Sequence, residues 1–231
     1  MMHAISQPSH PDKINIAVGG RKLSAKLDLP HGASGLVVLV HGSGSGRRIA
    51  LDKFVARSLQ SAGFATVRLD LLEECEAHDV RNVFDVELQA SRLIEVVREL
   101  GANPSTRSLP MGYLGSGTGA GTVLLAAAKD PARVSAVVSR GGRPDLALFW
   151  LPRITAPTLL IVGENDVPAV YWNKDAYRRI NAQKELVIVP GATHLFEENK
   201  TLKEAAHHAS RWFMRHLAPA RAGSGADMTS Q

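Results

Sequence analysis

Short apolar runs without polar interruptions recur through the middle of the chain, and segments with helical periodicity separate them. Continuous rather than alternating hydrophobicity is typical of strands buried on both faces, as in a parallel sheet covered by helices. We therefore predict a buried strand at each run. The runs are Leu36–Val40, Phe64–Leu69, Met111–Leu114, Val134–Val138, Leu159–Val162 and Leu186–Val189.

The segment before these runs has a different pattern. Lys13–Val18 and Lys22–Asp28 alternate between polar and apolar residues on either side of Gly19-Gly20, which predicts an antiparallel hairpin.

Three further segments carry apolar residues at helical spacing. The last of them begins with Thr201-x-x-Glu204, the pattern of a capping box. Strands that alternate with helices predict an α/β fold, a mostly parallel, doubly wound sheet that starts with the antiparallel hairpin. The three stripes are Leu51, Phe54, Val55, Leu59 and Ala62; then Val86, Ala90, Leu93, Val97 and Leu100; then Leu202, Ala205, Ala209 and Phe213.

The length of 231 residues fits one domain with a substantial core. We predict a flexible N-terminal segment over residues 1–12, a folded domain over 13–218 and a disordered tail over 219–231. The chain lacks the basic start and apolar block of a signal peptide, and no apolar run reaches the length of a membrane span. We therefore expect a cytoplasmic protein without a membrane partner.

A formal net charge of +5 invites a nucleic-acid function, but the basic residues are scattered and aromatic residues make up only 5% of the chain. Nucleic-acid binding relies on clustered cations and stacking platforms, so we expect no nucleic-acid partner. Cys75 is the only cysteine, which excludes a disulfide framework and a thiolate zinc cluster. We expect neither a metal nor an organic cofactor.

The segment with the most chemical information is Gly115-Ser116-Gly117-Thr118-Gly119, which follows one apolar run and precedes an Ala-rich helix. A strand, a sharp turn and a helix with small flanking residues form the nucleophile elbow, G-x-S-x-G. In this register the apex is Gly117 and not a serine. If Ser116 were the apex, Leu114 and Thr118 would occupy the two positions that need glycine.

Three more loops follow predicted strands, at the edge of the sheet where open α/β folds bind ligands. His41-Gly-Ser-Gly-Ser-Gly46 is a glycine-rich loop whose backbone N–H groups can hold an oxyanion, although a plain turn has the same composition. Gly163-Glu-Asn-Asp166 offers a carboxylate, and Gly191-Ala-Thr-His194 offers an imidazole. The order elbow, acid, base is the α/β-hydrolase order.

These motifs together make the chain resemble the α/β-hydrolase superfamily, and within it the lidless, dienelactone-hydrolase-like branch. The resemblance covers about Lys13 to Leu217. It implies an α/β-hydrolase fold without a cap domain. The motifs are His41-Gly-Ser-Gly-Ser-Gly46, Gly112-Tyr-Leu-Gly-Ser-Gly-Thr-Gly119, Ser139-Arg-Gly-Gly-Arg-Pro-Asp145, Leu160-Ile-Val-Gly-Glu-Asn-Asp166 and Pro190-Gly-Ala-Thr-His-Leu-Phe196.

The resemblance implies a role for each matching position. Asp166 is the acid and His194 the base, while the backbone N–H groups of Ser43 and Thr118 form the oxyanion hole. The nucleophile position falls on Gly117, where such proteins carry Ser or Cys. The implied substrate is a small carboxylic ester or lactone.

The departure at Gly117 leaves three alternatives. The hydroxyl was removed by mutagenesis, the protein is a natural relative that binds without hydrolysing, or His194 activates water without a nucleophile. Arg140 and Arg143 follow a predicted strand and are candidates for contact with an anionic substrate group, or else surface arginines. Trp150, Tyr171 and Trp172 line a pocket or pack in the core. The sequence does not indicate an oligomeric state.

Overall fold

The computed structural model describes residues 12–41, 46–198 and 200–217. The predicted tail over 219–231 and all but the last residue of the predicted segment 1–12 lie outside these residues. Within them the chain forms one eight-stranded sheet with helices on both faces, the predicted α/β-hydrolase architecture. The strands are β1 Asp12–Val18, β2 Arg21–Asp28, β3 Leu36–His41, β4 Ala65–Leu69, β5 Met111–Gly117, β6 Ala136–Gly142, β7 Thr158–Gly163 and β8 Lys184–Val189.

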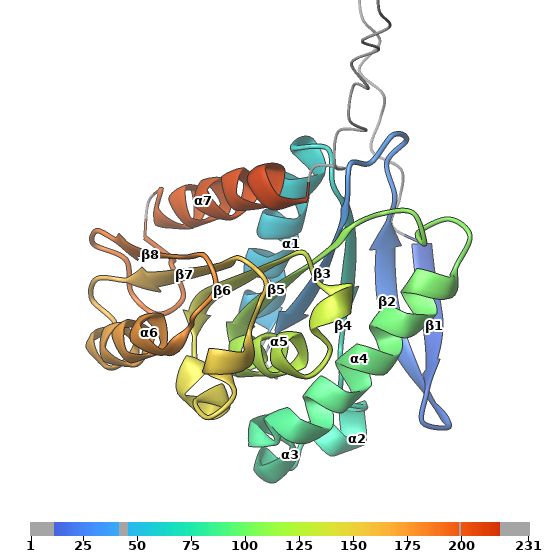
Figure 1. The fold of residues 1–231 in the computed structure, drawn as a ribbon, viewed down its shortest axis with the longest axis horizontal. Coiled ribbons are helices and arrows are strands. Elements are labelled where there is room, and N and C mark those ends of the chain that lie inside the picture. The colour runs from blue at the N-terminus through green and yellow to red at the C-terminus, as the bar shows by residue number, and fades with distance from the viewer. Residues whose placement is uncertain (1–11, 42–45, 199, 218–231) are drawn as a thin grey trace, which may run out of the picture.

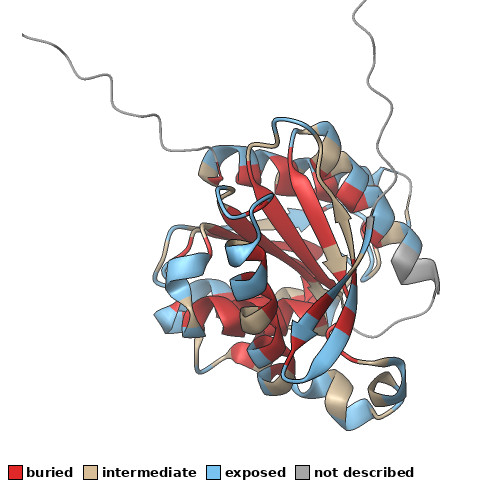
Figure 2. Cartoon of the chain, turned by 90° about the vertical axis from the view of Figure 1, so that its right-hand side faces the viewer, coloured by how far each residue is buried: buried red, intermediate tan, exposed pale blue. Residues whose placement is uncertain are grey.

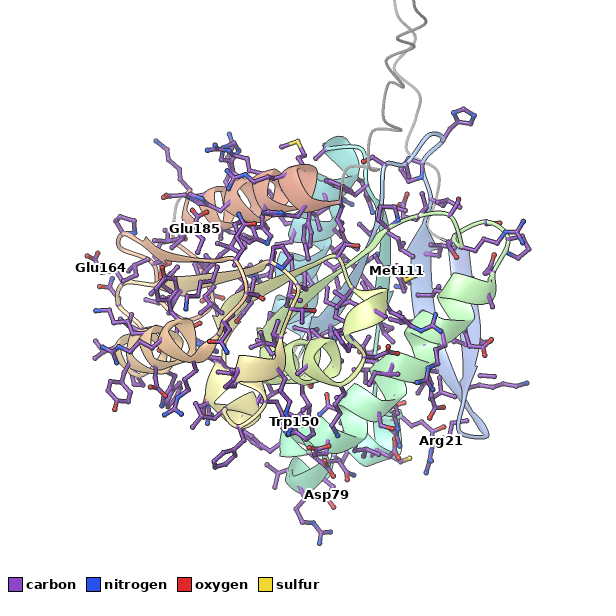
Figure 3. The ribbon with its side chains drawn as sticks, in the orientation of Figure 1. Arg21, Asp79, Met111, Trp150, Glu164 and Glu185 are labelled. Carbon is purple, nitrogen blue, oxygen red and sulfur yellow. The ribbon has the colours of Figure 1, made fainter. Side chains whose placement is uncertain are left out.

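The strands lie in the order β1-β2-β4-β3-β5-β6-β7-β8. β2 pairs antiparallel with both β1 and β4, and every other pair is parallel. The order runs across the whole molecule, with Arg21 of β2 at one end and Glu185 of β8 at the other (Figure 3). The predicted hairpin is confirmed, and Gly19 and Gly20 adopt positive φ angles of 53° and 79° at its turn.

Helices cover both faces of the sheet, as Figure 1 shows. One face carries α1 Gly46–Ser61 and α7 Thr201–His216, and the other carries α4 Val86–Ala102, α5 Thr118–Lys129 and α6 Val167–Arg179. The remaining helical turns are α2 Glu74–Ala77, α3 Val80–Phe84 and the 3₁₀ turns η1 Pro131–Arg133, η2 Pro144–Ala147 and η3 Leu151–Arg153.

The central strands are buried on both faces, as their continuous hydrophobicity predicts (Figure 2). All six residues of β7 and five of the six of β3 are buried. The core therefore has two parts, one on each side of the sheet. Between β6 and β7 the described residues form only η2 and η3, so there is no cap domain.

Two predictions about helices are wrong. Lys200, not Thr201, is the N-cap of α7, with a left-handed φ of 76° and no side-chain capping bond. The hydroxyl of Thr201 instead donates to the Glu198 carbonyl oxygen at 2.9 Å, so there is no capping box at this helix. In α1, Phe54 is 40% exposed while Asp52 is only 8% exposed. The buried face of α1 thus includes a carboxylate.

Among the described residues, no helix combines the length and the apolar composition needed to span a bilayer.

Candidate active site

The strand β5 ends in a sharp turn at Gly117, and α5 begins at the next residue. Gly117 has φ 57° and ψ −127°, a conformation that L residues adopt only with strain. The flanking glycines are needed for close packing: a Cβ on Gly115 would lie 2.5 Å from the Gly119 carbonyl oxygen, and one on Gly119 would lie 2.6 Å from the Val40 carbonyl oxygen. The backbone therefore has the geometry of a nucleophile elbow with Gly117 at its apex. A Cβ at Gly117 would meet no atom within 4 Å.

Asp166 and His194 are brought into contact from two neighbouring loops. Asp166 follows β7 and occupies the N-cap position of α6, but its carboxylate does not cap the helix. Its Oδ2 lies 2.7 Å from Nδ1 of His194, in the loop after β8. The Asp166 side chain is 13% exposed and that of His194 is 42% exposed. The contact through Nδ1 fixes the imidazole and leaves Nε2 at the opposite edge of the ring.

The two loops are joined by their backbones. The amide N–H groups of Glu164 and Asn165 donate to the carbonyl oxygens of Val189 and Ala192, at 3.0 and 2.9 Å. Glu164 Oε2 accepts from the Gly191 N–H at 2.9 Å. Gly163 permits this approach, because a Cβ there would lie 2.4 Å from the Ala192 carbonyl oxygen. The relative position of Asp166 and His194 is therefore set mainly by main-chain hydrogen bonds.

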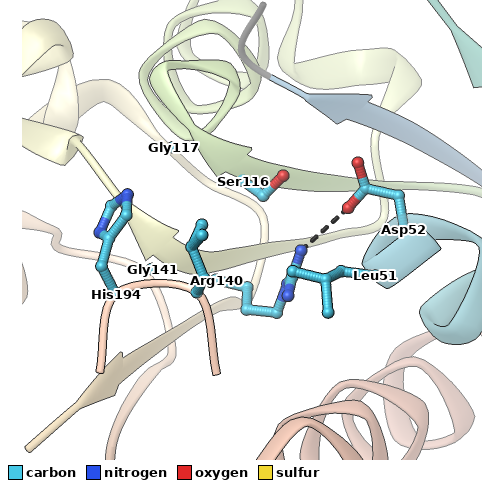
Figure 4. Close-up of a pocket in the computed structure, with 8 residues that line it drawn as sticks. Leu51, Asp52, Ser116, Gly117, Arg140, Gly141 and His194 are labelled. Atoms are coloured by element: carbon cyan, nitrogen blue, oxygen red, sulfur yellow. Dashed lines mark hydrogen bonds and ion pairs between the residues drawn. The ribbon is translucent and has the colours of Figure 1, made fainter. Parts of the chain in front are cut away.

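Gly117 and His194 line the same small pocket, whose volume of about 20 Å³ suits one water-sized group (Figure 4). Ser116 also lines the pocket, and in Figure 4 its hydroxyl points toward Asp52 while His194 lies on the opposite side. The described residues that line it are Leu51, Asp52, Ser116, Gly117, Arg140, Gly141, His194 and Leu195.

Gly141 fits the loop of His194 against β6. It has a φ of 51°, and a Cβ there would lie 2.8 Å from the His194 carbonyl oxygen. Only a residue without a side chain allows this approach.

Arg140 is buried at one side of the pocket and forms an ion pair with Asp52 of α1, Nη2 to Oδ1, at 2.9 Å. Among the described residues, Nε of Arg140 and Oδ2 of Asp52 have no hydrogen-bond partner. Burial lowers the pKa of the Arg140 guanidinium from its ordinary value, and the charge of Asp52 opposes that shift. The ion pair thus leaves one buried donor and one buried acceptor without a hydrogen-bond partner.

The other predicted site residues have different outcomes. Thr118 is the first residue of α5, so its N–H is one of the free donors of the helix N-terminus. Ser43 lies outside the described residues. Arg143 forms a two-bond ion pair with Asp145, at 2.8 and 2.7 Å, and its guanidinium lies 4.2 Å from the ring centre of Trp172. Arg143 does not line the pocket.

The predicted alternatives for the aromatic residues resolve in different ways. Trp150 packs at the edge of the core between Lys129 and Arg153, and Tyr171 is exposed. Within the part of the chain that the structure describes, no three His, Cys, Asp or Glu side chains gather as a metal site.

Sequence reasoning did not identify Asp52 and Gly141 as parts of the site. Asp52 pairs with Arg140 across 88 residues, so no local pattern indicates the contact. For Gly141, the sequence signal was the pair Gly141-Gly142 at the end of a predicted strand. Glycine at the end of a strand suggests that another backbone approaches closely.

Residues 23–218 match the model of the family described as the dienelactone hydrolase family. A crystal structure of dienelactone hydrolase from Anabaena variabilis is 47% identical, covers 90% of this chain and 100% of that chain, and superposes with a TM-score of 0.85. An α/β serine hydrolase without a lid from Xanthomonas campestris shares the fold at 19% identity, with a TM-score of 0.70 over 93% of this chain and 98% of that chain.

A curated relative from Mycobacterium tuberculosis, named a putative phosphoribosyl transferase, is 47% identical over 214 residues, which are 93% of this chain and 48% of the relative. The chain thus spans about half the length of the curated relatives that it matches.

Proposed function

The chain belongs to the dienelactone hydrolase family, and from that premise we propose that its site binds small carboxylic esters or lactones and lacks only the nucleophile for hydrolysing them. The observation that carries the proposal is the elbow geometry at Gly117, in one pocket with a His194 that Asp166 holds. The name of the Anabaena relative, a lactone hydrolase, supports the substrate class. The transferase name of the mycobacterial relatives applies to proteins about twice as long as this chain.

The proposed roles are those that the family resemblance assigns to these positions; Ser43 lies outside the described residues. In a Gly117→Ser variant the introduced hydroxyl attacks the ester carbonyl, and His194 Nε2 takes its proton. Asp166 keeps the imidazole in the required tautomer and stabilises its charged form. The N–H groups of Thr118 and Ser43 stabilise the oxyanion. His194 then returns the proton to the leaving alcohol, and water hydrolyses the acyl-enzyme with the same base.

Gly117 offers no hydroxyl or thiol at the elbow apex to form the acyl-enzyme. Ser116 does not replace it, because its side chain belongs to the residue before the apex and points away from His194 (Figure 4). We therefore propose that the natural state is binding without turnover. When one triad residue is removed from well-studied serine proteases, the remaining rate is only roughly 10³–10⁴-fold above that of the reaction in water. Any hydrolysis by the chain with Gly117 should therefore be slow.

The first test is to compare the chain with its Gly117→Ser variant on p-nitrophenyl butyrate. We expect kcat/KM to rise by at least about 10³-fold, the scale of losses when the nucleophile of a triad is removed. The variant, but not the parent, should react with a fluorophosphonate probe. Gly117→Ala is the matched control, since it brings the same backbone strain, about 1–3 kcal/mol, without the hydroxyl.

Two results would contradict the proposal. One is substantial hydrolysis by the parent that disappears on Ser116→Ala, because the elbow register would then be wrong. The other is a folded Gly117→Ser variant that is inert to ester and probe, which would favour a binding protein whose site has lost more than its nucleophile.

A further inference from the structure

A second cavity adjoins the pocket on the same face of the sheet. Its volume is about 140 Å³, and Asp52 lines both hollows. It lies under α1, over the strands β2, β4, β3 and β5. Its lining residues are Ser24, Ala25, Lys26, Leu39, Val40, His41, Asp52, Arg68, Leu69, Asp70 and Leu114.

The strand register shows how the two hollows meet. His41, Ser116 and Arg140 are partners across β3, β5 and β6; Ser116 and Arg140 line the first pocket, and His41 lines the second cavity. A second row lies two residues earlier along β3 and β5. Its members pair in the order Lys26 of β2, Arg68 of β4, Leu39 of β3 and Leu114 of β5. Because two residues along a strand span about 6.6 Å, the second row begins directly beside the first.

The second row contains an unusual pair. Lys26 and Arg68 lie directly opposite each other in the antiparallel ladder of β2 and β4, so both side chains emerge on one face. Like charges in this arrangement repel and destabilise a sheet. Both residues line the cavity. Neither cation forms a hydrogen bond or a close ion pair with another described residue, although the charge of Lys26 acts on Asp70 and those of Asp28 and Asp52 act on Arg68.

The acids near the two cations have other partners. Asp52 binds Arg140, and Asp70 binds His41 Nε2 at 2.9 Å, a hydrogen bond that lowers the pKa of the Asp70 carboxyl. Asp28 and Asp52 attract the Arg68 charge at a distance, without an ion pair. Burial still lowers the pKa of the Arg68 guanidinium from its ordinary value. An anion between Lys26 and Arg68 would compensate both the burial and the repulsion.

We propose that Lys26 and Arg68 form an anion subsite that holds a carboxylate or phosphate group of the substrate while its ester or lactone carbonyl lies at Gly117. This assignment rests on the proposed function and narrows its substrate class. Leu39 and Leu114 lie on the sheet between the two ends, and Asp52 of α1 lines both hollows, so an uncharged aliphatic segment suits the connection between the groups. Arg68 lies two strands away from β5, and its row meets β5 three residues before Gly117. If the Arg68 side chain extends toward Gly117, the gap between its guanidinium and Gly117 is roughly 10 Å, which the aliphatic segment would span.

The first experiment needs no turnover. Adipate and n-butyl phosphate are titrated into the unmodified chain by calorimetry, and the tighter ligand identifies the anion. We expect Arg68→Gln and Lys26→Gln each to weaken binding of that ligand by about tenfold or more, the usual effect of losing a charge-assisted hydrogen bond. Arg107→Gln is the matched control, since Arg107 is exposed and lines neither hollow.

A thermal unfolding measurement without ligand separates a binding arginine from a structural one. Arg68→Gln removes a like-charge repulsion, so its Tm should equal or exceed that of the parent. A structural arginine would lower the Tm on removal. Lys26→Gln, on the outer strand pair, provides an independent variant if Arg68→Gln does not fold.

The second experiment uses the Gly117→Ser background. The half p-nitrophenyl esters of glutaric, adipic and suberic acids are compared with their methyl-capped neutral counterparts. We expect KM to be lower for one or more of the charged esters than for their neutral counterparts, Arg68→Gln to abolish that difference, and Arg107→Gln to keep it. If Gly117→Ser is inert while the unmodified chain still binds the anion through Arg68, the proposed hydrolase function fails and the subsite stands. Failure of the parent to bind either anion, or equal binding by Arg68→Gln and Arg107→Gln, would overturn the subsite.

Discussion

At Gly117, the conformation of the backbone and the chemistry of the side chain can be considered separately. Its backbone holds the strained turn of an elbow, and its missing side chain removes the chemistry. Glycine adopts positive φ angles without the steric penalty that a Cβ brings. The chain therefore keeps the shape of the turn at a lower conformational cost than a serine would impose.

Gly141 gives a prediction at the same scale. In the Gly117→Ser background, Gly141→Ala should lower kcat by about tenfold or more, because the new methyl group would lie 2.8 Å from the His194 carbonyl oxygen and displace the base. Gly191→Ala is the matched control, since Gly191 also has a positive φ, 69°, but a Cβ there meets no atom within 4 Å. Equal losses in the two variants would show that backbone strain, and not the displaced loop, is responsible.

Single residues show how far the sequence predicts the site. Gly117, Asp166 and His194 follow from spacing, because each lies at the carboxyl end of a strand or in the loop after it. The structure places Gly117 and His194 on one pocket and Asp166 in contact with His194. Their chemical roles remain predictions. Arg140 was a candidate for substrate contact, but its pairing with Asp52 was not predictable, since a charged residue on an amphipathic helix normally faces solvent.

At the scale of elements, the strands follow the sequence more closely than the helix ends do. Continuous apolar runs identify the central buried strands because both faces need apolar residues. The run Leu186–Val189 was wrongly predicted to be buried: it belongs to the edge strand β8, of which only Val189 is buried. The capping box at Thr201 failed because the local pattern does not contain the left-handed turn at Lys200 that precedes α7. The face of α1 was misjudged at Phe54, since burial of Asp52 depends on an arginine from a distant strand.

The contact between α2 and α4 gives a pH-dependent prediction. Two hydrogen bonds from Arg92, with Arg21 nearby, lower the pKa of Glu76 to about 2 from 4.5. Because the pKa is lowered in the folded state, its stabilisation is present above the unfolded pKa and disappears as pH falls toward 2.

Glu76→Gln should therefore reduce the free energy of unfolding by about 2 kcal/mol at pH 7, as for other hydrogen bonds between charged groups. The difference from the parent should shrink below pH 4.5 and vanish near pH 2. Urea titrations of both proteins across this pH range measure the effect. A difference that stays constant with pH would show that the carboxylate charge is not its source.

At the scale of the whole molecule, we propose that residues 13–218 form one folding unit. The two apolar clusters among the described residues pack on opposite faces of one sheet, so they share its strands. Removing residues 1–11 and 219–231 together should change Tm by no more than about 2 °C, because the described residues of both apolar clusters lie between Ile14 and Leu217 and surface changes alter stability by about 0.5 kcal/mol.

Scanning calorimetry of the shortened and full-length chains tests this prediction. A variant that also lacks α7 is the contrast, because it loses the buried Phe213 and Trp212 from one face of the sheet. That variant should not fold. A large fall in Tm on removal of the terminal segments alone would show that the folding unit extends beyond these bounds.

The main-chain hydrogen bonds between the loops of Asp166 and His194 have an evolutionary consequence. They do not involve the apex residue, so selection for folding alone preserves the arrangement of acid and base after the hydroxyl is lost. Glycine and serine codons differ by one base, GGC against AGC, so the reverse change is equally accessible. On the proposed function, a lineage with this architecture can lose and regain hydrolysis by single substitutions at position 117, without passing through an unfolded intermediate.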